Sequence, residues 1–456
     1  MQKKLIVLAL AGLASSAAFA QTNVTIYGVI DEFVGYGKAS QDRLTNPGTG
    51  VTTLNSGGDQ SFSGLQSGGL SGSRLGFKGE EGLGNGLKAI FVYELGTLDP
   101  TSTANAAGAN GANGNNFTKS RQSYVGLTGG WGTAIAGRLQ SPGYDTSLKF
   151  DPMAASVFSP TLTIAGNNGM TIMSGDAGRL NNAIAYVTPN FSGFSAELAY
   201  AFGEQITGTN WNGGTVPASF IPNPNTGVNV SNGFDSAQSV WGGNLNYDNG
   251  PLALTLAAHF INNAGGTGNA PSQAAPLFTR VSDLKQTEYQ VAGSYDFKMA
   301  KLFGSYQYIK QENFASLGQG TNNIYSFNTV TGAFAGGLGS TVLTTGNTTG
   351  NLWNIGVNVP VGANGVVKAA YTHYSNSMSN TYNLLGERLN LRDQSVQVFG
   401  IDYEYSFSKR TTAYAGYSYL DNGRSTAYGY SAGNVGVTPS ADNSAWNIGA
   451  GLRHTF

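Results

Sequence analysis

The feature that most limits how this chain can fold is a two-residue alternation of side-chain character that recurs along its length. From Leu87 to Leu95 the odd-numbered positions are apolar, while Lys88 and Glu94 lie at even-numbered positions. Between Phe194 and Phe202 the large aromatic and aliphatic residues again share one parity, with Ser195, Glu197 and Ala199 on the other. A period of two is typical of a β-strand whose two faces meet different surroundings. The sequence therefore predicts strands with one apolar and one polar face.

The connections between these strands alternate between short and long. Gly82 to Gly86 contains Asn85-Gly86, and Asn-Gly favours a tight hairpin turn because both residues tolerate positive φ. Other connections, such as 97–118, 203–237 and 311–350, are long and rich in Gly, Asn, Ser and Thr. We predict sixteen strands, at residues 24–36, 73–81, 87–96, 120–128, 132–139, 181–188, 194–202, 238–247, 252–262, 287–297, 301–310, 351–359, 365–374, 394–406, 411–420 and 444–456.

The polar face that recurs on these strands indicates what the sheet encloses. Such a face cannot pack an apolar interior, but it can line a water channel, as in barrels of sixteen strands. Closure leaves no unpaired strand edge, which the bilayer requires. Short turns on one rim and long loops on the other are typical of outer-membrane barrels, whereas a propeller would show a motif in each blade. We predict an all-β fold over residues 21–456, a transmembrane sixteen-stranded antiparallel β-barrel.

Residues 1–20 have the pattern of a cleaved secretory signal peptide. Lys3 and Lys4 precede an apolar run from Leu5 to Leu13, and the segment ends in small residues around Phe19. The apolar run is too short to cross a membrane as a helix, for which about 20 residues are needed. The mature chain is therefore expected to begin at Gln21 and to function outside the cytoplasm.

Composition excludes several classes of function. The chain has no cysteine, which removes disulfides and thiolate metal sites. Without Lys3 and Lys4, 22 basic residues face 25 acidic ones, so no basic surface for nucleic acid is expected. His259, His373 and His454 each lie alone in a predicted strand, and a catalytic base needs a partner within hydrogen-bond reach. We expect no enzymatic activity, no metal and no cofactor.

One glycine-rich stretch superficially matches a dinucleotide-binding motif. Gly84 to Ala89 has glycines at suitable spacing, but that motif must open a helix. Here Ile90 to Tyr93 continues as a predicted strand. The stretch is therefore interpreted as the hairpin turn.

Residues 140–178 form a connection that is too long for a hairpin turn. Unexplained loops of this length in compact domains are usually functional or disordered. We expect this one to fold into the mouth of the barrel and to narrow it. Its carboxylates Asp145, Asp151 and Asp176 would then face Arg138 and Arg179, which lie at the ends of the flanking strands.

Four segments resemble the neisserial-type general porins of β-proteobacteria: Val24 to Asp31, Ser73 to Gly84, Arg121 to Leu127 and Gly451 to Phe456. The resemblance covers essentially the whole chain. It implies a homotrimer of barrels in the outer membrane, in contact with lipid and lipopolysaccharide, with the third extracellular loop of each barrel folded inward. It also implies that the terminal aromatic residue, Phe456, is the assembly signal read by the barrel-insertion machinery.

The resemblance places the pore arginines of that family at Arg74, Arg121 and Arg179, to which we add Arg138 from strand parity. Arg121 conflicts with strict alternation if Val125 faces lipid, so it needs a bulge, a position on the rim or a role at an interface. A ring of charge in a narrow passage biases which ions enter. We therefore expect a weak preference for anions, which the facing aspartates could offset.

Two functions remain open from the sequence. The first is a general diffusion channel for ions and small hydrophilic solutes. The second is a substrate-selective channel, or a surface adhesin that acts through the long loops. Aromatic residues lining one side of the pore would favour a selective channel for sugars, and Tyr144, Phe150 and Phe158 lie in the expected constriction loop.

Overall fold

The chain is almost entirely β-strand in the part that the computed structural model describes. That part comprises residues 23–40, 44–45, 52–53, 59–96, 119–168, 178–202, 238–263, 284–315, 327–328, 333–334, 345–382, 388–389, 394–423, 428–430, 436–439 and 443–456. The predicted signal peptide lies outside these residues. Within them no helix is both long and apolar enough to cross a membrane.

The main elements are the strands of a single sheet and two helices in the connection between β8 and β9. They are β1 (Asn23–Ala39), β4 (Gln60–Ser67), β5 (Arg74–Gly84), β6 (Leu87–Gly96), β7 (Lys119–Gly129), β8 (Gly132–Gln140), α2 (Pro142–Phe150), α3 (Pro160–Asn168), β9 (Arg179–Val187), β10 (Phe194–Ala201), β11 (Gln238–Asn249), β12 (Leu252–Asn263), β13 (Leu284–Asp296), β14 (Lys301–Ala315), β17 (Thr345–Val361), β18 (Gly365–Tyr382), β20 (Gln394–Ser406), β21 (Thr411–Asn422) and β22 (Ser444–Thr455). The remaining strands, β2 (Leu44–Thr45), β3 (Thr52–Thr53), β15 (Phe327–Asn328), β16 (Ala333–Phe334) and β19 (Arg388–Leu389), have two residues each.

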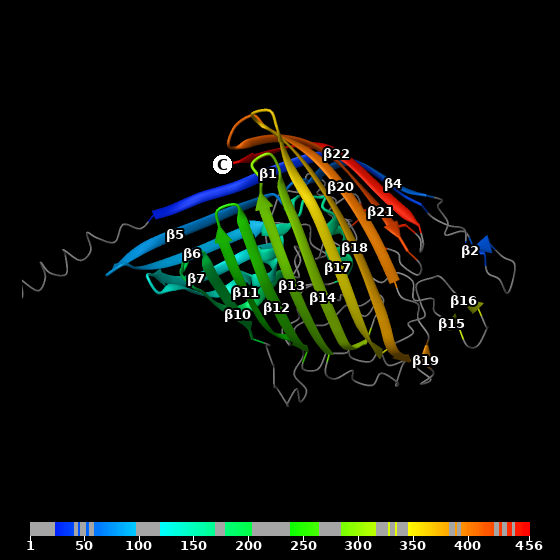
Figure 1. Ribbon diagram of the computed structural model, residues 1–456, viewed down its shortest axis with the longest axis horizontal. Helices are drawn as coiled ribbons and strands as arrows, with labels where there is room; N and C mark the ends of the chain where they lie inside the picture. Colours follow the sequence, from blue (N-terminus) through cyan, green and yellow to red (C-terminus); the bar gives the residue numbers. More distant parts are fainter. Residues whose placement is uncertain are drawn as a thin grey trace, which may run out of the picture.

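The sheet closes because its first and last strands pair with each other. β22 runs antiparallel to β1, from Val29 opposite Thr455 to Ala39 opposite Ala445, and Figure 1 shows the red end of the chain beside its blue start. The final residue continues the ladder, since Phe456 N donates to Gly28 O at 3.1 Å. The predicted antiparallel barrel is confirmed.

Eighteen strand segments of the sheet make up sixteen wall strands, as predicted. β4 and β5 both pair with β1, one after the other, so they form one interrupted wall strand. β19 pairs with the last two residues of β18, in line with β20, which pairs with the earlier part of β18. The sequence prediction began the second strand at Ser73 and missed β4, because the glycine-rich interruption at 68–73 has the composition of a loop.

The two faces of the wall follow the predicted alternation. On β12 the side chains of Leu254 and Leu256 are exposed, whereas Thr255 and His259 are buried. His259 Nε2 accepts a hydrogen bond from Gly143 N at 3.0 Å, and Gly143 belongs to α2. The buried face is therefore the inner face of the barrel, and the apolar face is the outer one.

The interruption between β4 and β5 is a bend that folds into the barrel and is held by one buried carboxylate. Asp31 Oδ2 accepts hydrogen bonds from the backbone N–H groups of Leu70 and Ser71, both at 2.8 Å. Its other oxygen, Oδ1, accepts from the Tyr414 hydroxyl at 2.5 Å. The bend in turn accepts a hydrogen bond at Gly69 O from Val157 N. β1 and β21 thus fix the bend, and the bend supports the segment that follows α2.

Each helix of the long connection begins at a side-chain cap. Ser141 Oγ accepts from Tyr144 N at 3.1 Å, and Pro142 follows the cap, where its missing N–H costs nothing. Ser159 Oγ accepts from Leu162 N at 3.2 Å at the start of α3. These caps explain why a stretch without strand alternation still has regular structure.

Candidate functional site

The segment 141–168, which contains both helices, lies inside the barrel, where α2 packs against β10 to β14 and α3 packs against β18 and β20. Near its start, Pro142 O accepts a hydrogen bond from Asn244 of β11 at 2.9 Å. Near its end, Thr161 Oγ1 accepts from Asn354 of β17 at 2.8 Å. The ends of the connection meet, because Ser141 N donates to Gly178 O at 2.8 Å. We call 141–168 the crossing segment.

Asp151 shapes the turn after α2 and does not face the arginines, contrary to the prediction. Its carboxylate accepts hydrogen bonds from Met153 N at 3.0 Å, Ala155 N at 2.8 Å and Ser159 Oγ at 2.6 Å. Burial raises the pKa of this carboxyl group, although these hydrogen bonds act in the opposite direction. A short polar side chain that satisfies nearby backbone N–H groups is a turn-forming device. Sequence spacing could not distinguish this use from a lining charge.

A buried carboxylate, Glu94 of β6, gathers two of the predicted arginines on the inner face. Arg121 Nε lies 2.8 Å from Glu94 Oε1, and Arg74 Nε lies 3.6 Å from Oε2. Tyr27 donates its hydroxyl hydrogen bond to Oε2 at 3.0 Å. We call these four residues the Glu94 cluster. Two guanidinium groups therefore share one carboxylate.

Arg121 reaches this cluster through a β-bulge. In the pairing of β6 with β7, Glu94 lies opposite Gln122 and Leu95 lies opposite Ser120, so Arg121 has no partner in the ladder. The extra residue of a bulge changes which face the next side chain takes. Of the three explanations that strict alternation left open for Arg121, the structure shows the bulge.

Arg179, the first residue of β9, lies against the start of the crossing segment. Its guanidinium carbon is 5.3 Å from the centre of the Tyr144 ring, a cation–π contact. The charge of Arg179 also acts on Asp145. The Asp145 side chain is open to the barrel interior, but the surrounding protein removes part of its hydration. This desolvation raises the pKa of Asp145 to about 6, and Arg179 acts against the shift.

Arg138 faces outward, and its predicted place among the inward arginines is wrong. It pairs with Ser123, two positions along β7 from Val125, whose side chain is 64% exposed on the outer face. Its side chain donates to Ser120 O at 2.8 Å and also bonds Asn181 Oδ1. The inward position is taken by the next residue, Leu139, which is buried in an apolar cluster.

Two further expectations concerned Asp176 and the aromatic residues of the long connection. Asp176 lies outside the described residues. Tyr144, Phe150 and Phe158 are buried, with exposed fractions of 6%, 1% and 0%. Side chains packed in this way do not offer a row of ring faces to a passing sugar, so they give no support to the selective channel.

Reasoning from the sequence missed Glu94 as a site residue, although a signal for it existed. Alternation places Glu94 on the polar face of β6, and the β5–β6 register, which shifts between Gly82 and Gly84, places Gly76 opposite Glu94 and Arg74 opposite Gly96. An inward carboxylate two positions along the ladder from an inward arginine favours an ion pair. The contact of Tyr27 with Glu94 cannot be predicted in this way, because β1 and β5 are joined by a long connection that does not set their register.

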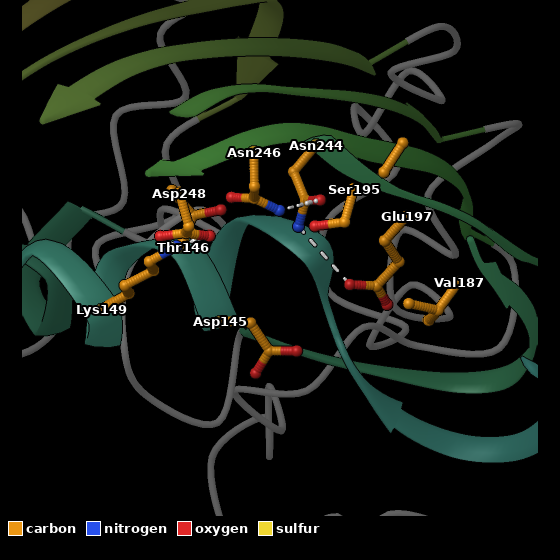
Figure 2. Close-up of a pocket in the computed structure, with 10 residues that line it drawn as sticks. Asp145, Thr146, Lys149, Val187, Ser195, Glu197, Asn244, Asn246 and Asp248 are labelled. Atoms are coloured by element: carbon orange, nitrogen blue, oxygen red, sulfur yellow. Dashed lines mark hydrogen bonds and ion pairs between the residues drawn. The ribbon is translucent and has the colours of Figure 1, made fainter. Parts of the chain in front are cut away.

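A polar hollow, which we call the α2 recess, lies between α2 and strands β9 to β11 (Figure 2). Its volume is about 150 Å³, and it is lined by Asp145, Thr146, Lys149, Val187, Ser195, Ala196, Glu197, Asn244, Asn246 and Asp248. Lys149 Nζ lies 2.6 and 2.7 Å from the two carboxylate oxygens of Asp248. Among the described residues, no group of three or more His, Cys, Asp or Glu side chains is arranged to hold a metal ion.

The chain is similar over its whole length to two proteobacterial proteins. It is 28% identical to outer membrane porin protein 32 of Delftia acidovorans and 27% identical to an outer membrane porin protein of Bordetella pertussis, with all of both chains covered in each case. It is also 32% identical to the major outer membrane protein P.IB of Neisseria gonorrhoeae over 204 residues, which are 44% of this chain and 48% of that protein.

A solved structure and a family model agree with these relatives. The fold matches an anion-selective porin from Comamonas acidovorans with a TM-score of 0.63 and 25% sequence identity, covering 96% of this chain and 100% of that one. The family model described as Gram-negative porin matches residues 6–426. With its closed sixteen-stranded barrel, the chain belongs to the Gram-negative porin family.

Proposed function

We propose that this outer-membrane porin is a general diffusion channel whose weak preference for anions is set by Arg74, Arg121 and Arg179. Members of the family are channel proteins, and passive transfer down a gradient needs only a water-filled path and a constriction. In this proposal the crossing segment is the constriction, which is supported by its position inside the barrel beside β11 and β17.

The charge balance beside the crossing segment is the observation that carries the proposal. Arg74 and Arg121 share the single carboxylate of Glu94, which leaves one net positive charge in the Glu94 cluster, while Arg179 lies beside Asp145. In a narrow passage with low-dielectric walls, such a charge attracts anions and repels cations. Because the carboxylates offset most of the positive charge, the expected preference is weak.

The relatives support the same sign of selectivity. The Comamonas acidovorans porin is described as anion-selective, and its fold covers nearly all of this chain. We also propose that the protein assembles as a homotrimer, as its resemblance to neisserial-type porins implies. Chemical cross-linking of the unheated protein in detergent would test this, and a ladder ending at three chains is expected.

The decisive experiment is the zero-current potential of single channels under a salt gradient. Wild-type protein should give a small potential of the anion-selective sign. The double variant Arg74→Gln, Arg121→Gln should shift it toward cations, because Glu94 would then lie unpaired beside the passage. Lys88→Gln is a matched control, since Lys88 pairs with Glu80 at an exposed site near the short turn. An unchanged potential in the double variant would remove these arginines from the constriction.

A further inference from the structure

The first turn of α2 has one backbone donor whose partner comes from the barrel wall. The first N–H groups of a helix have no partner inside the helix. Tyr144 N donates to Ser141 Oγ at 3.1 Å, and Asp145 N donates to Ser141 O at 3.2 Å. Gly143 N donates instead to Nε2 of His259, on β12, at 3.0 Å. The wall histidine therefore completes the cap of α2.

The wall leaves space for this imidazole ring. His259 is 0% exposed, and it lies opposite Gly242 in the pairing of β11 with β12. A Cβ added at Gly242 would lie 2.9 Å from His259 Cδ2, 3.0 Å from Nε2 and 3.2 Å from Pro142 Cδ. The glycine thus makes room for both the ring and the first residue of the helix. On the other side of the ring, the buried Glu288 of β13 lies opposite His259.

The contact requires the neutral form of the ring. A neutral imidazole has one donor and one acceptor nitrogen, whereas a protonated imidazole has two donors. Because Nε2 of His259 accepts from Gly143, the ring hydrogen is on Nδ1. A glutamine side chain can also offer an acceptor at this place, but a leucine side chain cannot.

The turn that His259 holds carries the groups that lie beside Arg179. Tyr144, next to Gly143, has its ring 5.3 Å from the Arg179 guanidinium carbon. Asp145 borders the α2 recess, where the surrounding protein limits its hydration and the charge of Arg179 acts on it. A side chain keeps a defined position in a site only when packing and hydrogen bonds fix the element that carries it. The place of Gly143 against the wall therefore decides the place of Asp145.

We propose that His259 is a positioning residue of the constriction, which holds α2 against the wall through Gly143 and so sets how far Asp145 extends into water beside Arg179. His259 acts through the helix and not by contact with passing ions, since its side chain is buried. The inference rests on the proposed channel, because its readout is ion preference.

The test is the zero-current potential under a potassium chloride gradient, recorded from about pH 4 to about pH 8. Limited hydration raises the pKa of Asp145 to about 6, so the ion preference of the wild type should change around that pH. In His259→Leu the Gly143 N–H loses its acceptor, α2 moves from the wall and Asp145 gains water. The midpoint should then fall by about one pH unit, toward the range of an ordinary aspartate.

A conservative variant and a control separate positioning from a general effect of substitution. His259→Gln keeps an acceptor for Gly143 N and should restore the wild-type midpoint. His373→Leu makes the same exchange as His259→Leu on the outer face, where His373 lies opposite the exposed Trp353, and it should leave the midpoint unchanged. Equal midpoints in His259→Leu and wild type would overturn the inference, as would equal shifts in His259→Leu and His259→Gln.

A second variant reaches the same contact from β11. Gly242→Ala places a methyl group against the ring and should also lower the midpoint, whereas Gly304→Ala, with open space around it, should not. The potassium chloride conductance of each variant, measured first, shows that it folds and opens. If His259→Leu does not insert, Gly242→Ala decides; if neither inserts, the contact serves folding and the inference is wrong. A flat wild-type profile would also overturn it, and absence of conductance in wild type would instead contradict the channel itself.

Discussion

At the scale of single residues, Glu94 controls how much positive charge the passage presents. Its side chain is 7% exposed and is shared by Arg74 and Arg121. Glu94→Gln should therefore move the zero-current potential further toward anions, because one negative charge is lost and both arginines remain. Glu80→Gln removes a carboxylate that is 53% exposed and pairs with Lys88, so it should move the potential much less. Equal shifts in the two variants would contradict this role of Glu94.

The pKa of Asp145, raised to about 6, predicts a pH dependence of ion selectivity. Above this pH the carboxylate is charged and offsets Arg179, and below it the neutral acid no longer does so. Anion preference should therefore increase as the pH falls from about 7 to about 5, well above the range of an ordinary aspartate. Zero-current potentials measured across this range provide the test. Asp145→Asn should be flat there, and a wild-type profile that is equally flat would contradict the assignment.

At the scale of elements, the bend between β4 and β5 depends on a buried hydrogen-bond network around Asp31. Tyr414→Phe removes the hydroxyl that donates to Asp31 Oδ1 but keeps the ring beside Phe158. The free energy of unfolding should fall by about 1.5–3 kcal/mol, the usual contribution of a hydrogen bond to a charged group. Denaturant unfolding in detergent measures it. Tyr419→Phe changes an exposed side chain and should be nearly neutral.

A second prediction at this scale concerns the seam, which is the pairing of β1 with β22 that closes the barrel. A Cβ added at Gly28 would lie 2.3 Å from the Phe456 ring and 2.8 Å from Arg74 O. Because one of these neighbours is backbone, Gly28→Ala should destabilise the seam by about 1–3 kcal/mol, as overpacking usually does. The temperature at which the folded band disappears in semi-native electrophoresis reports the change. Gly82→Ala, with open space around it, is the control, and equal temperatures would contradict the predicted clash.

At the scale of the whole molecule, the barrel and the crossing segment are separable. Ser141 and Gly178 already meet through a backbone hydrogen bond, so residues 143–176 can be replaced by a short glycine-serine link without moving the wall. The shortened protein should still insert and conduct. Its single-channel conductance should rise and its ion preference should weaken, because the wall loses the obstacle that brings solutes close to the arginines. An unchanged conductance would show that the narrowest point lies elsewhere.

The accuracy of the sequence predictions differed between the wall and its interior. Alternation and turn chemistry predicted the sixteen wall strands, because each strand meets lipid on one side and the interior on the other. Arg138 shows the limit: Ala134, Ile135 and Ala136 are all apolar, so hydrophobicity does not reveal which face of β8 is the outer one, and only the pairing with β7 places Arg138 there. The inward parity of Glu94 is readable from alternation, but its exact partners are not, because the β5–β6 ladder shifts register between Gly82 and Gly84.

The sequence by itself determined the barrel, since the two-residue period is a local property that every hairpin repeats. Only the tertiary structure decided what crosses the interior and which charges meet there. Asp151 accepts hydrogen bonds within a turn, and Arg121 points inward at a β-bulge. Asp31 fixes the bend between β4 and β5 together with Tyr414, which is far away in the chain. Such contacts carry no periodic signal, because their geometry exists only after the wall has closed and brought distant strands around a common space.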